Sequence, residues 1–185
     1  MDEPSDEELM RRVAGGDELA FRLLARRSVP AAIGLARRML GNTADAEEVV
    51  QEAMLRAWTN APRWRPEALF RTWLYRVVIN LCLNRKRRAP FASLSDAGDP
   101  ADPRPDAATQ MERNQRDRAI ASAIALLPER QRAAILLTYQ EGLSNAEAAA
   151  VLGTTRSAVE TLLVRAKQSL RRQLGPQASD DETGE

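Results

Sequence analysis

A segment rich in proline and aspartate divides this 185-residue chain into two parts. Residues 89–110 contain four prolines, four aspartates and one glycine, with few apolar residues. Such a composition cannot bury enough apolar surface to fold alone, so we predict a flexible acidic linker here. The stretches on either side, about 90 and about 65 residues long, are each long enough for a small domain. We therefore expect two domains, over residues 1–88 and 111–174, and a disordered tail over 175–185.

Apolar side chains recur at helical spacing on both sides of the linker, which predicts an all-α protein. Ser5 and Ser144 each precede a glutamate by three residues, and this capping-box pattern marks the start of a helix. Glycines that favour the backbone of a helix end follow several apolar runs, at Gly15, Gly41, Gly142 and Gly153. The sequence thus predicts short-looped helical bundles in both domains.

Two stretches of the first domain allow more than one interpretation. Pro30 cannot sit undisturbed inside a helix, so it predicts a kink or a restart, with Ser28 as a possible new N-cap. Residues 67–88 are dense in apolar side chains and predict one long helix. The β-branched run at 77–79 leaves a strand as the alternative.

The composition excludes several classes of enzyme. The chain has no histidine and a single cysteine, so no internal disulfide, zinc site, serine triad or Cys–His pair can be built within it. We expect no catalytic residues, no metal and no cofactor. Cys82 lies in an apolar helix, where we expect an inert thiol. Residues 1–8 are acidic rather than basic and apolar, and no apolar run could span a bilayer, which predicts a cytoplasmic protein without a signal peptide.

Charge is segregated along the chain, although the net charge is only +1. Residues 63–88 hold eight cationic residues against one acidic residue, and residues 154–174 hold five against one. Two separate basic segments in a nearly neutral protein favour two contacts with a polyanion. The alternative is a pair of solvated helix faces.

The spacing near the C-terminus is typical of a helix-turn-helix. Ala149 is small enough for a close helix crossing, Gly153 suits a turn with positive φ, and Val159 can anchor the second helix. Leu152 and Leu162 would complete the buried side. The exposed side would present residues that can hydrogen-bond base edges in a major groove, namely Thr155, Arg156, Ser157, Glu160, Thr161 and Val164. Cations within reach of phosphates would be Arg165, Lys167, Arg171 and Arg172. An ordinary helical hairpin with a glycine turn is the alternative.

Aromatic residues concentrate beside arginines in the first domain. Five of them fall within eighteen residues, namely Trp58, Trp64, Phe70, Trp73 and Tyr75. Rings that stack on bases beside arginines that neutralise phosphates are typical of a site for unstacked bases. For Phe70 and Leu74 we favour the alternative, a place in the core. Trp64 lies between prolines in a predicted loop, so we expect it to act at the surface.

An acidic helix precedes this aromatic segment. Asp45, Glu48 and Glu52 share one face at spacings of three and four residues. Like charges on one face cost a little stability, so the pattern favours a basic protein partner. A merely solvated face is the alternative.

These segments, in this order, closely resemble the bacterial extracytoplasmic-function (ECF) sigma factors, the smallest class of sigma-70-type transcription initiation factors. The stretches that carry the resemblance are DAEEVVQEAMLRAW (45–58), FRTWLYRVVINLCLNRKRR (70–88), LPERQRAAILLTYQEGLSNAEAAAVLG (127–153) and AVETLLVRAKQSLR (158–171). The resemblance implies two helical domains, called sigma-2 and sigma-4, joined by a flexible linker. It also implies that the chain gives core RNA polymerase its promoter specificity, under the control of an anti-sigma factor that could hold it at the inner membrane.

The resemblance implies a role for each candidate residue. Docking on the clamp helices of the polymerase β′ subunit would use Asp45, Glu48, Gln51 and Glu52. Recognition and melting of the −10 element would use Arg63, Trp64, Arg71, Trp73, Arg76, Asn80, Asn84 and Arg85. The −35 element would be read by Thr155, Arg156, Ser157, Glu160, Thr161 and Arg165. The second domain would also bind the β-flap tip. An anti-sigma factor could share an apolar surface at Leu35, Met39, Val50 and Met54, although a place in the core is the simpler interpretation.

Two residues depart from the family pattern, and the sequence leaves two other functions open. Glu160 and Leu162 stand where many family members carry lysine or arginine. A regulator that binds operator DNA directly through its helix-turn-helix is the main alternative function, and a helical adaptor without a nucleic-acid role is another. The tryptophan-rich segment favours the sigma factor, because a simple repressor has no need to melt DNA.

Overall fold

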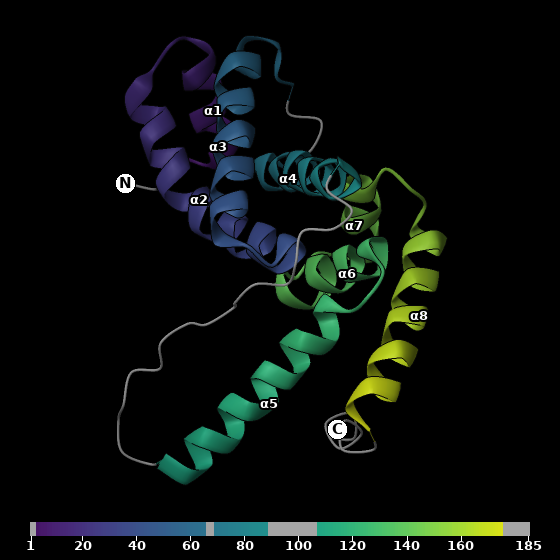
Figure 1. The fold of residues 1–185 in the computed structure, drawn as a ribbon. Coiled ribbons are helices and arrows are strands. Elements are labelled where there is room, and N and C mark those ends of the chain that lie inside the picture. Colours follow the sequence, from purple (N-terminus) through teal and green to yellow (C-terminus); the bar gives the residue numbers. More distant parts are fainter. Residues whose placement is uncertain (1–2, 66–68, 89–106, 176–185) are drawn as a thin grey trace.

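The computed structural model describes residues 3–65, 69–88 and 107–175 and shows a helical protein (Figure 1). The described residues contain no strand, so the all-α prediction is confirmed and the strand alternative at 77–79 is wrong. The predicted tail lies outside the described residues except for Gly175. The predicted linker also lies outside them, except for its last four residues, which form the start of a helix.

The described residues of the first domain form a bundle of four helices. Asp17 caps the second of them by accepting a hydrogen bond from the Ala20 N–H over 3.0 Å. The fully buried side chains of this domain include Leu24, Leu35 and Phe70. In chain order the elements are α1 (Asp6–Ala14), α2 (Glu18–Leu40), α3 (Thr43–Asn60), the 3₁₀ turn η1 (Ala61–Arg63) and α4 (Phe70–Arg88).

Two predictions for the first domain need correction. Helix α2 runs without interruption through Pro30, so Ser28 is not an N-cap. Pro30 is exposed, while Leu24 and Leu35 on either side of it are fully buried, so tertiary packing holds the helix across the missing backbone donor. Helix α4 begins at Phe70 rather than near residue 67.

The second domain is a smaller helical bundle. Its elements are α5 (Ala107–Ala125), α6 (Glu129–Ile135), the π-helical turn η2 (Leu136–Gln140), α7 (Asn145–Leu152) and α8 (Arg156–Leu174). Helix α5 begins at Ala107, four residues before the predicted start of the domain. Ser144 forms the predicted capping box with Glu147. Helices α5 and α8 extend away from the compact part formed by α6 and α7 (Figure 1).

The two domains pack against each other. Helix α4 of the first domain lies against α7 of the second (Figure 1), and α2 contacts both α5 and α6. Buried apolar residues of both domains belong to one continuous cluster. This closed arrangement brings residues far apart in the sequence into contact and sets the positions of the candidate interfaces.

Candidate nucleic-acid and protein interfaces

Helix α8 is held by one face and open on the other. Gly153 ends α7 with the left-handed backbone (φ 59°, ψ 45°) that the predicted turn requires. Thr155 caps α8, its hydroxyl accepting from the Ala158 N–H over 3.2 Å. Val159 is fully buried, as predicted, whereas Leu162 is only partly buried and Leu163 takes the buried position. The six residues predicted to contact the −35 element are all exposed.

Two interactions order the exposed face of α8. The guanidinium Nε of Arg156 donates to Glu160 Oε1 over 2.9 Å, an ion pair one helical turn apart. The hydroxyl of Thr161 donates to the main-chain carbonyl of Ser157 over 3.0 Å. Glu160 thus pairs with the neighbouring arginine on the exposed face, where the Arg156 side chain is 72% exposed.

Four of the residues predicted to contact the −10 element share one face of α4. Their spacings of three and four residues place them along one line, on the side away from the buried face. Arg76, Asn80 and Asn84 are exposed, and Trp73 is half-buried with its ring stacked on Phe70 at 5.9 Å between centroids. We call this set the α4 polar face; its members are Trp73, Arg76, Asn80 and Asn84.

The other residues predicted for the −10 element lie elsewhere. Arg63 is exposed in η1, and Trp64 follows it, half-buried against the core rather than fully at the surface. Arg71 lies on the side of α4 turned toward the second domain, where its charge acts on Tyr75 and Glu147. Arg85 lies on the side turned toward α3. Phe70 and Leu74 are fully buried, which confirms their assignment to the core.

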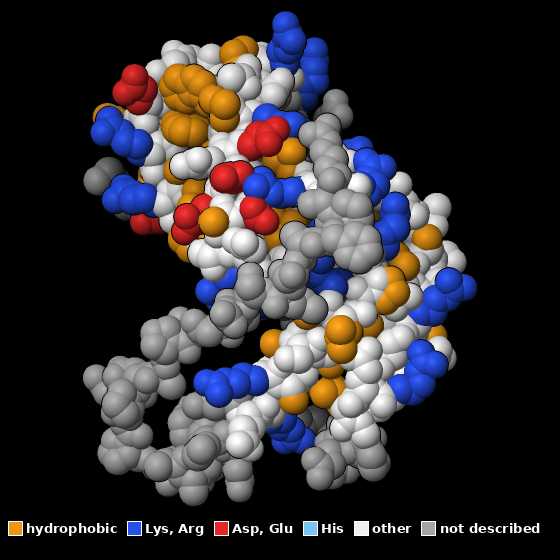
Figure 2. Space-filling model, viewed as in Figure 1, with side chains coloured by type: hydrophobic (Ala, Val, Ile, Leu, Met, Phe, Trp, Pro, Cys, Tyr) orange, Lys and Arg blue, Asp and Glu red, His pale blue; other side chains and the backbone are white. Residues whose placement is uncertain are grey.

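The acidic face of α3 is paired within the chain. We call it the acidic ridge, formed by Asp45, Glu48 and Glu52 with Gln51 beside them, and it lies on the face shown in Figure 2, where acidic side chains gather over α3. One guanidinium nitrogen of Arg85 lies 2.6 Å from Asp45 Oδ1 and 2.8 Å from Glu48 Oε2. These carboxylates raise the pKa of Arg85. Glu52 pairs with Arg56 over 2.6 Å.

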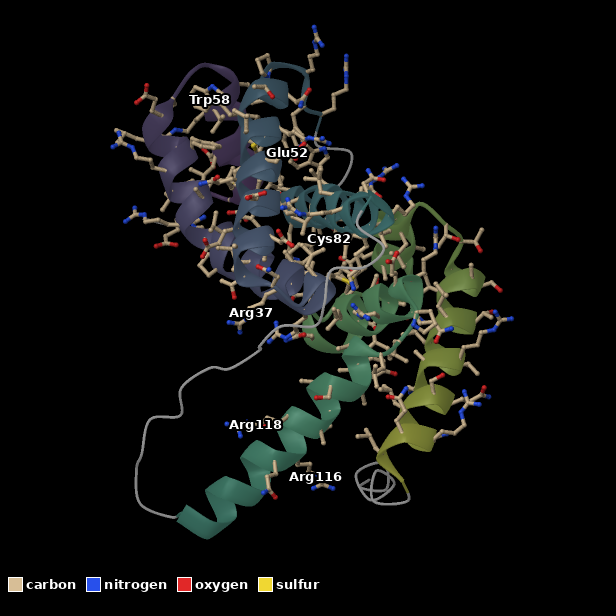
Figure 3. The ribbon with its side chains drawn as sticks, in the orientation of Figure 1. Arg37, Glu52, Trp58, Cys82, Arg116 and Arg118 are labelled. Atoms are coloured by element: carbon tan, nitrogen blue, oxygen red, sulfur yellow. The ribbon has the colours of Figure 1, made fainter. Side chains whose placement is uncertain are left out.

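An apolar groove of about 520 Å³ runs between α2 and α3 next to the ridge. Figure 2 shows apolar side chains gathered there, and Figure 3 labels Trp58 near its end on α3. The ring of Trp58 meets that of Phe21 edge-on at 5.1 Å. Leu35 and Met39 are fully buried in the core, whereas Val50 and Met54 are buried and also line the groove.

The contact between the domains contains a buried arginine that the sequence analysis did not single out. Arg132 is 5% exposed, and its guanidinium donates only to main-chain carbonyls. In the second domain it donates to Ile124 (3.1 Å), Leu127 (3.1 Å) and Ala125, and in the first domain to Met39 (2.8 Å). Burial lowers its pKa. One sequence signal could have found Arg132: it is a cation among the apolar residues of a predicted helix, three positions before Ile135.

A second polar contact crosses the same boundary. The hydroxyl of Tyr75 on α4 donates to Glu141 Oε2 over 2.5 Å, and burial together with this carboxylate raises the pKa of Tyr75. Cys82 lies further along α4, where it approaches the second domain (Figure 3), and is fully buried. Burial raises the pKa of its thiol to about 12.

Neither metal ligands nor a membrane span are found in the described ranges. No group of three or more His, Cys, Asp or Glu side chains there could hold a metal ion. No helix in the same residues is both long enough and apolar enough to cross a membrane.

Comparison with known families matches both domains. The family model for sigma-70 region 2 matches residues 24–90, and the model for sigma-70 region 4 matches residues 117–170. The ECF RNA polymerase sigma factor SigM of Mycobacterium tuberculosis is 36% identical over 176 residues, covering 94% of this chain and 86% of SigM. This chain belongs to the ECF sigma factors of the sigma-70 family. The function of the sigma factor is therefore to direct transcription initiation by RNA polymerase.

Other relatives and solved structures agree. RNA polymerase sigma-H factor of Pseudomonas aeruginosa is 33% identical to this sigma factor. The alignment covers 92% of this chain and 94% of the sigma-H factor. The structure of CnrH in complex with the cytosolic domain of CnrY superposes with a TM-score of 0.71 at 30% identity, over 92% of this chain and 97% of CnrH. Bartonella quintana RpoE, solved with the anti-sigma factor NepR, shares the fold with a TM-score of 0.66 at 23% identity, over 83% and 96% of the two chains.

Proposed function

We propose that three surfaces of this sigma factor have separate binding roles in transcription initiation. The acidic ridge docks on the clamp helices of the polymerase β′ subunit, and the second domain binds the β-flap tip. The α4 polar face recognises and melts the −10 element, together with Arg63 and Trp64 before it and with Arg71 and Arg85, which lie on other sides of α4. The exposed face of α8 reads the −35 element in the major groove, through Thr155, Arg156, Ser157, Glu160, Thr161 and Arg165.

The observation that carries the proposal is the composition of the α4 polar face. Exposed amides and an arginine lie beside a half-buried tryptophan on a helix whose opposite side is core. Melted bases need a ring to stack on, amide groups for their exposed edges and a cation for the backbone. A factor that only binds duplex DNA has no use for such a face, so this face favours a melting role over that of an operator-binding regulator.

The face of α8 supports duplex reading. Its buried side holds the helix on the rest of the second domain, and its N-terminal turn is capped and exposed. Hydroxyls and an arginine at the N-terminal end of such a helix can reach base edges in the major groove. Arg165, about two and a half turns beyond Arg156, is exposed and suited to a phosphate contact.

The closed arrangement must open on a promoter. Helix α8 packs on α7, and α7 packs on α4, so two helix contacts separate the two DNA-reading helices. Packed helix axes lie 8–10 Å apart, which gives about 20 Å in all. The −10 and −35 elements are about 25 base pairs apart, or roughly 85 Å along B-DNA. One closed molecule cannot reach both elements, so docking on polymerase must separate the domains.

An anti-sigma factor would act on the closed arrangement. CnrH, which superposes on 92% of this chain, was solved with the cytosolic domain of CnrY. A partner that binds the closed form better than the open form keeps the two DNA-reading helices close together by population shift. We place the protein in the cytoplasm, either free or held at the inner membrane by such a partner, and assign it a regulatory rather than a catalytic role.

Transcription with a melting readout tests the division of work. Core polymerase and the sigma factor would first be used to select transcribed fragments from a genomic library. On a selected promoter, Trp73→Ala and Asn80→Ala should reduce permanganate reactivity of thymines at the −10 element at least tenfold, with polymerase binding unchanged. Glu52→Gln should weaken polymerase binding instead. Undiminished melting with both α4 variants would contradict the assignment of the α4 polar face.

A further inference from the structure

We propose that Arg85 changes partners during initiation: it is the internal counterion of the acidic ridge in the free chain, and docking on polymerase releases it toward DNA. The inference rests on the proposed docking role of the ridge. It assigns to one side chain the coupling between binding of polymerase and binding of the melted strand.

The geometry places Arg85 between the two functions. It lies in the last turn of α4, whose polar face is proposed to bind DNA, yet its guanidinium reaches across to α3. A single nitrogen of that group contacts both Asp45 (2.6 Å) and Glu48 (2.8 Å). Of the cations paired with the ridge in the described residues, Arg85 comes from another helix, whereas Arg56 lies on α3 itself.

The ridge is therefore largely neutralised in the free chain. Asp45 and Glu48 share Arg85, and Glu52 has Arg56. A cationic helix that docks on the ridge must compete with Arg85 for the same carboxylate oxygens. The competition is feasible because the three side chains are partly exposed, Arg85 to 38% and Glu48 to 63%, and exposed ion pairs contribute little net stability.

A released Arg85 has an anion within reach when promoter DNA is present. Along α4 it follows Asn84 of the α4 polar face and precedes Arg87, whose guanidinium donates to Asn84 Oδ1. Lys86 is turned instead toward Glu129 and Arg132 of the second domain. The long, always charged arginine side chain suits a phosphate of the strand held by that face. Because coupling between two sites is reciprocal, DNA held by Arg85 would in turn strengthen docking on polymerase.

The test uses the free chain and a fluorescent single-stranded oligonucleotide of mixed sequence at low salt. Asp45→Asn combined with Glu48→Gln removes the internal partners of Arg85. We expect Arg85→Ala to change the oligonucleotide Kd less than twofold in the native background, and to weaken binding at least fivefold in the Asp45→Asn, Glu48→Gln background. An equal effect of Arg85→Ala in both backgrounds would overturn the inference.

Two matched controls separate exchange from simple charge removal. Glu47→Gln with Glu52→Gln makes the same change in charge on the same helix but leaves both partners of Arg85 in place. In that background Arg85→Ala should change the oligonucleotide Kd less than twofold. Arg87→Ala removes a cation two residues along α4 and should weaken binding equally in the native and Asp45→Asn, Glu48→Gln backgrounds. Circular dichroism melts would confirm that each variant is folded.

A second arm uses core polymerase and separates this inference from the proposed function. If Arg85 competes for the ridge, Arg85→Ala should tighten polymerase binding about threefold or more in the native background and not when Asp45 and Glu48 are neutralised. Weaker polymerase binding by Arg85→Ala would mean that the arginine only orients the ridge, which overturns the exchange and leaves docking intact. If neutralising Glu48 and Glu52 leaves polymerase binding unchanged, the docking assignment itself is wrong. That conclusion does not depend on the result of the oligonucleotide-binding experiment.

Discussion

The guanidinium of Arg132 donates a hydrogen bond across the domain boundary to the main-chain carbonyl of Met39, over 2.8 Å and 93 positions of sequence. The same side chain donates to three carbonyls at the end of α5 and after it. A buried arginine satisfied only by carbonyls acts as a cross-link between helix ends, because it supplies donors to carbonyls that lack an intrahelical partner there. Of these carbonyls, that of Ile124 also accepts from the Leu127 N–H over 3.1 Å. We therefore expect the closed arrangement of the sigma factor to depend on this residue.

Replacement of Arg132 by alanine should destabilise the protein strongly. The change leaves buried carbonyls of both domains without a donor, and we expect a loss of about 3 kcal/mol in the free energy of unfolding. Urea denaturation followed by circular dichroism measures it. Arg130→Ala is the matched control, because Arg130 makes a single bond to the Leu152 carbonyl and should cost less than about 1 kcal/mol. Equal losses for the two variants would contradict the role assigned to Arg132.

Tyr75→Phe should loosen the contact between the domains without disrupting the core. The variant loses only the hydroxyl that donates to Glu141, so we expect a cost of about 1–2 kcal/mol. Its readout is the rate at which Cys82 reacts with a thiol reagent at pH 8. Burial raises the pKa of Cys82 to about 12, so the native thiol should be nearly inert, and opening should return its pKa toward the ordinary range.

The same thiol reports on docking. Core polymerase should accelerate modification of Cys82 at least tenfold if docking separates the domains, and Cys82→Ser serves as the blank. Protection of Cys82 by polymerase, in the presence of a DNA that occupies both promoter elements, would indicate that the domains stay together.

Glu7→Gln should make the stability of the protein less dependent on pH in the acidic range. Glu7 Oε1 accepts from the Phe70 N–H at the start of α4 over 3.0 Å, and this bond lowers the pKa of Glu7. A folded-state pKa below the unfolded value gives stability that is present above about pH 4.5 and is lost as pH falls through the folded-state pKa. Native protein should therefore lose more stability between pH 6 and pH 3 than the variant. Parallel thermal melts over that range would reveal the difference, and superimposable profiles would exclude it.

Arg156→Ala should weaken use of the −35 element by about 1–3 kcal/mol if Arg156 contacts a base. Its ion pair with Glu160 holds the guanidinium along the helix, so Glu160→Ala should alter preference at the same base position. A panel of −35 variants, assayed by initiation rate with polymerase, tests both. A uniform loss over the whole panel would assign Arg156 to a phosphate.

Local signals in the sequence predicted much of the fold. Gly153 has the predicted left-handed backbone and Ser144 forms the predicted capping box, because both depend on residues within one turn. Phe70 and Leu74 lie in the core as their spacing indicated. Pro30 shows where local reasoning fails, since packing of buried residues on both sides keeps α2 continuous.

The parts of the candidate sites that escaped prediction are non-local. Arg85 is one of the predicted −10 residues, and nothing in the sequence indicates that its guanidinium reaches Asp45 and Glu48 on α3. Arg132 and Tyr75 owe their roles to the packing of one domain on the other. Spacing along a helix predicts which residues share a face, but the element that covers the face is set by the tertiary fold.

The central claim is that this chain gives core RNA polymerase its choice of promoter. Run-off transcription on genomic fragments, with purified core polymerase in the presence and absence of the chain, tests it most directly. We predict discrete transcripts that require the chain and share a start site, and only weak binding of the same fragments by the chain alone. Tight binding of a fragment without polymerase, combined with no initiation when polymerase is added, would contradict the account.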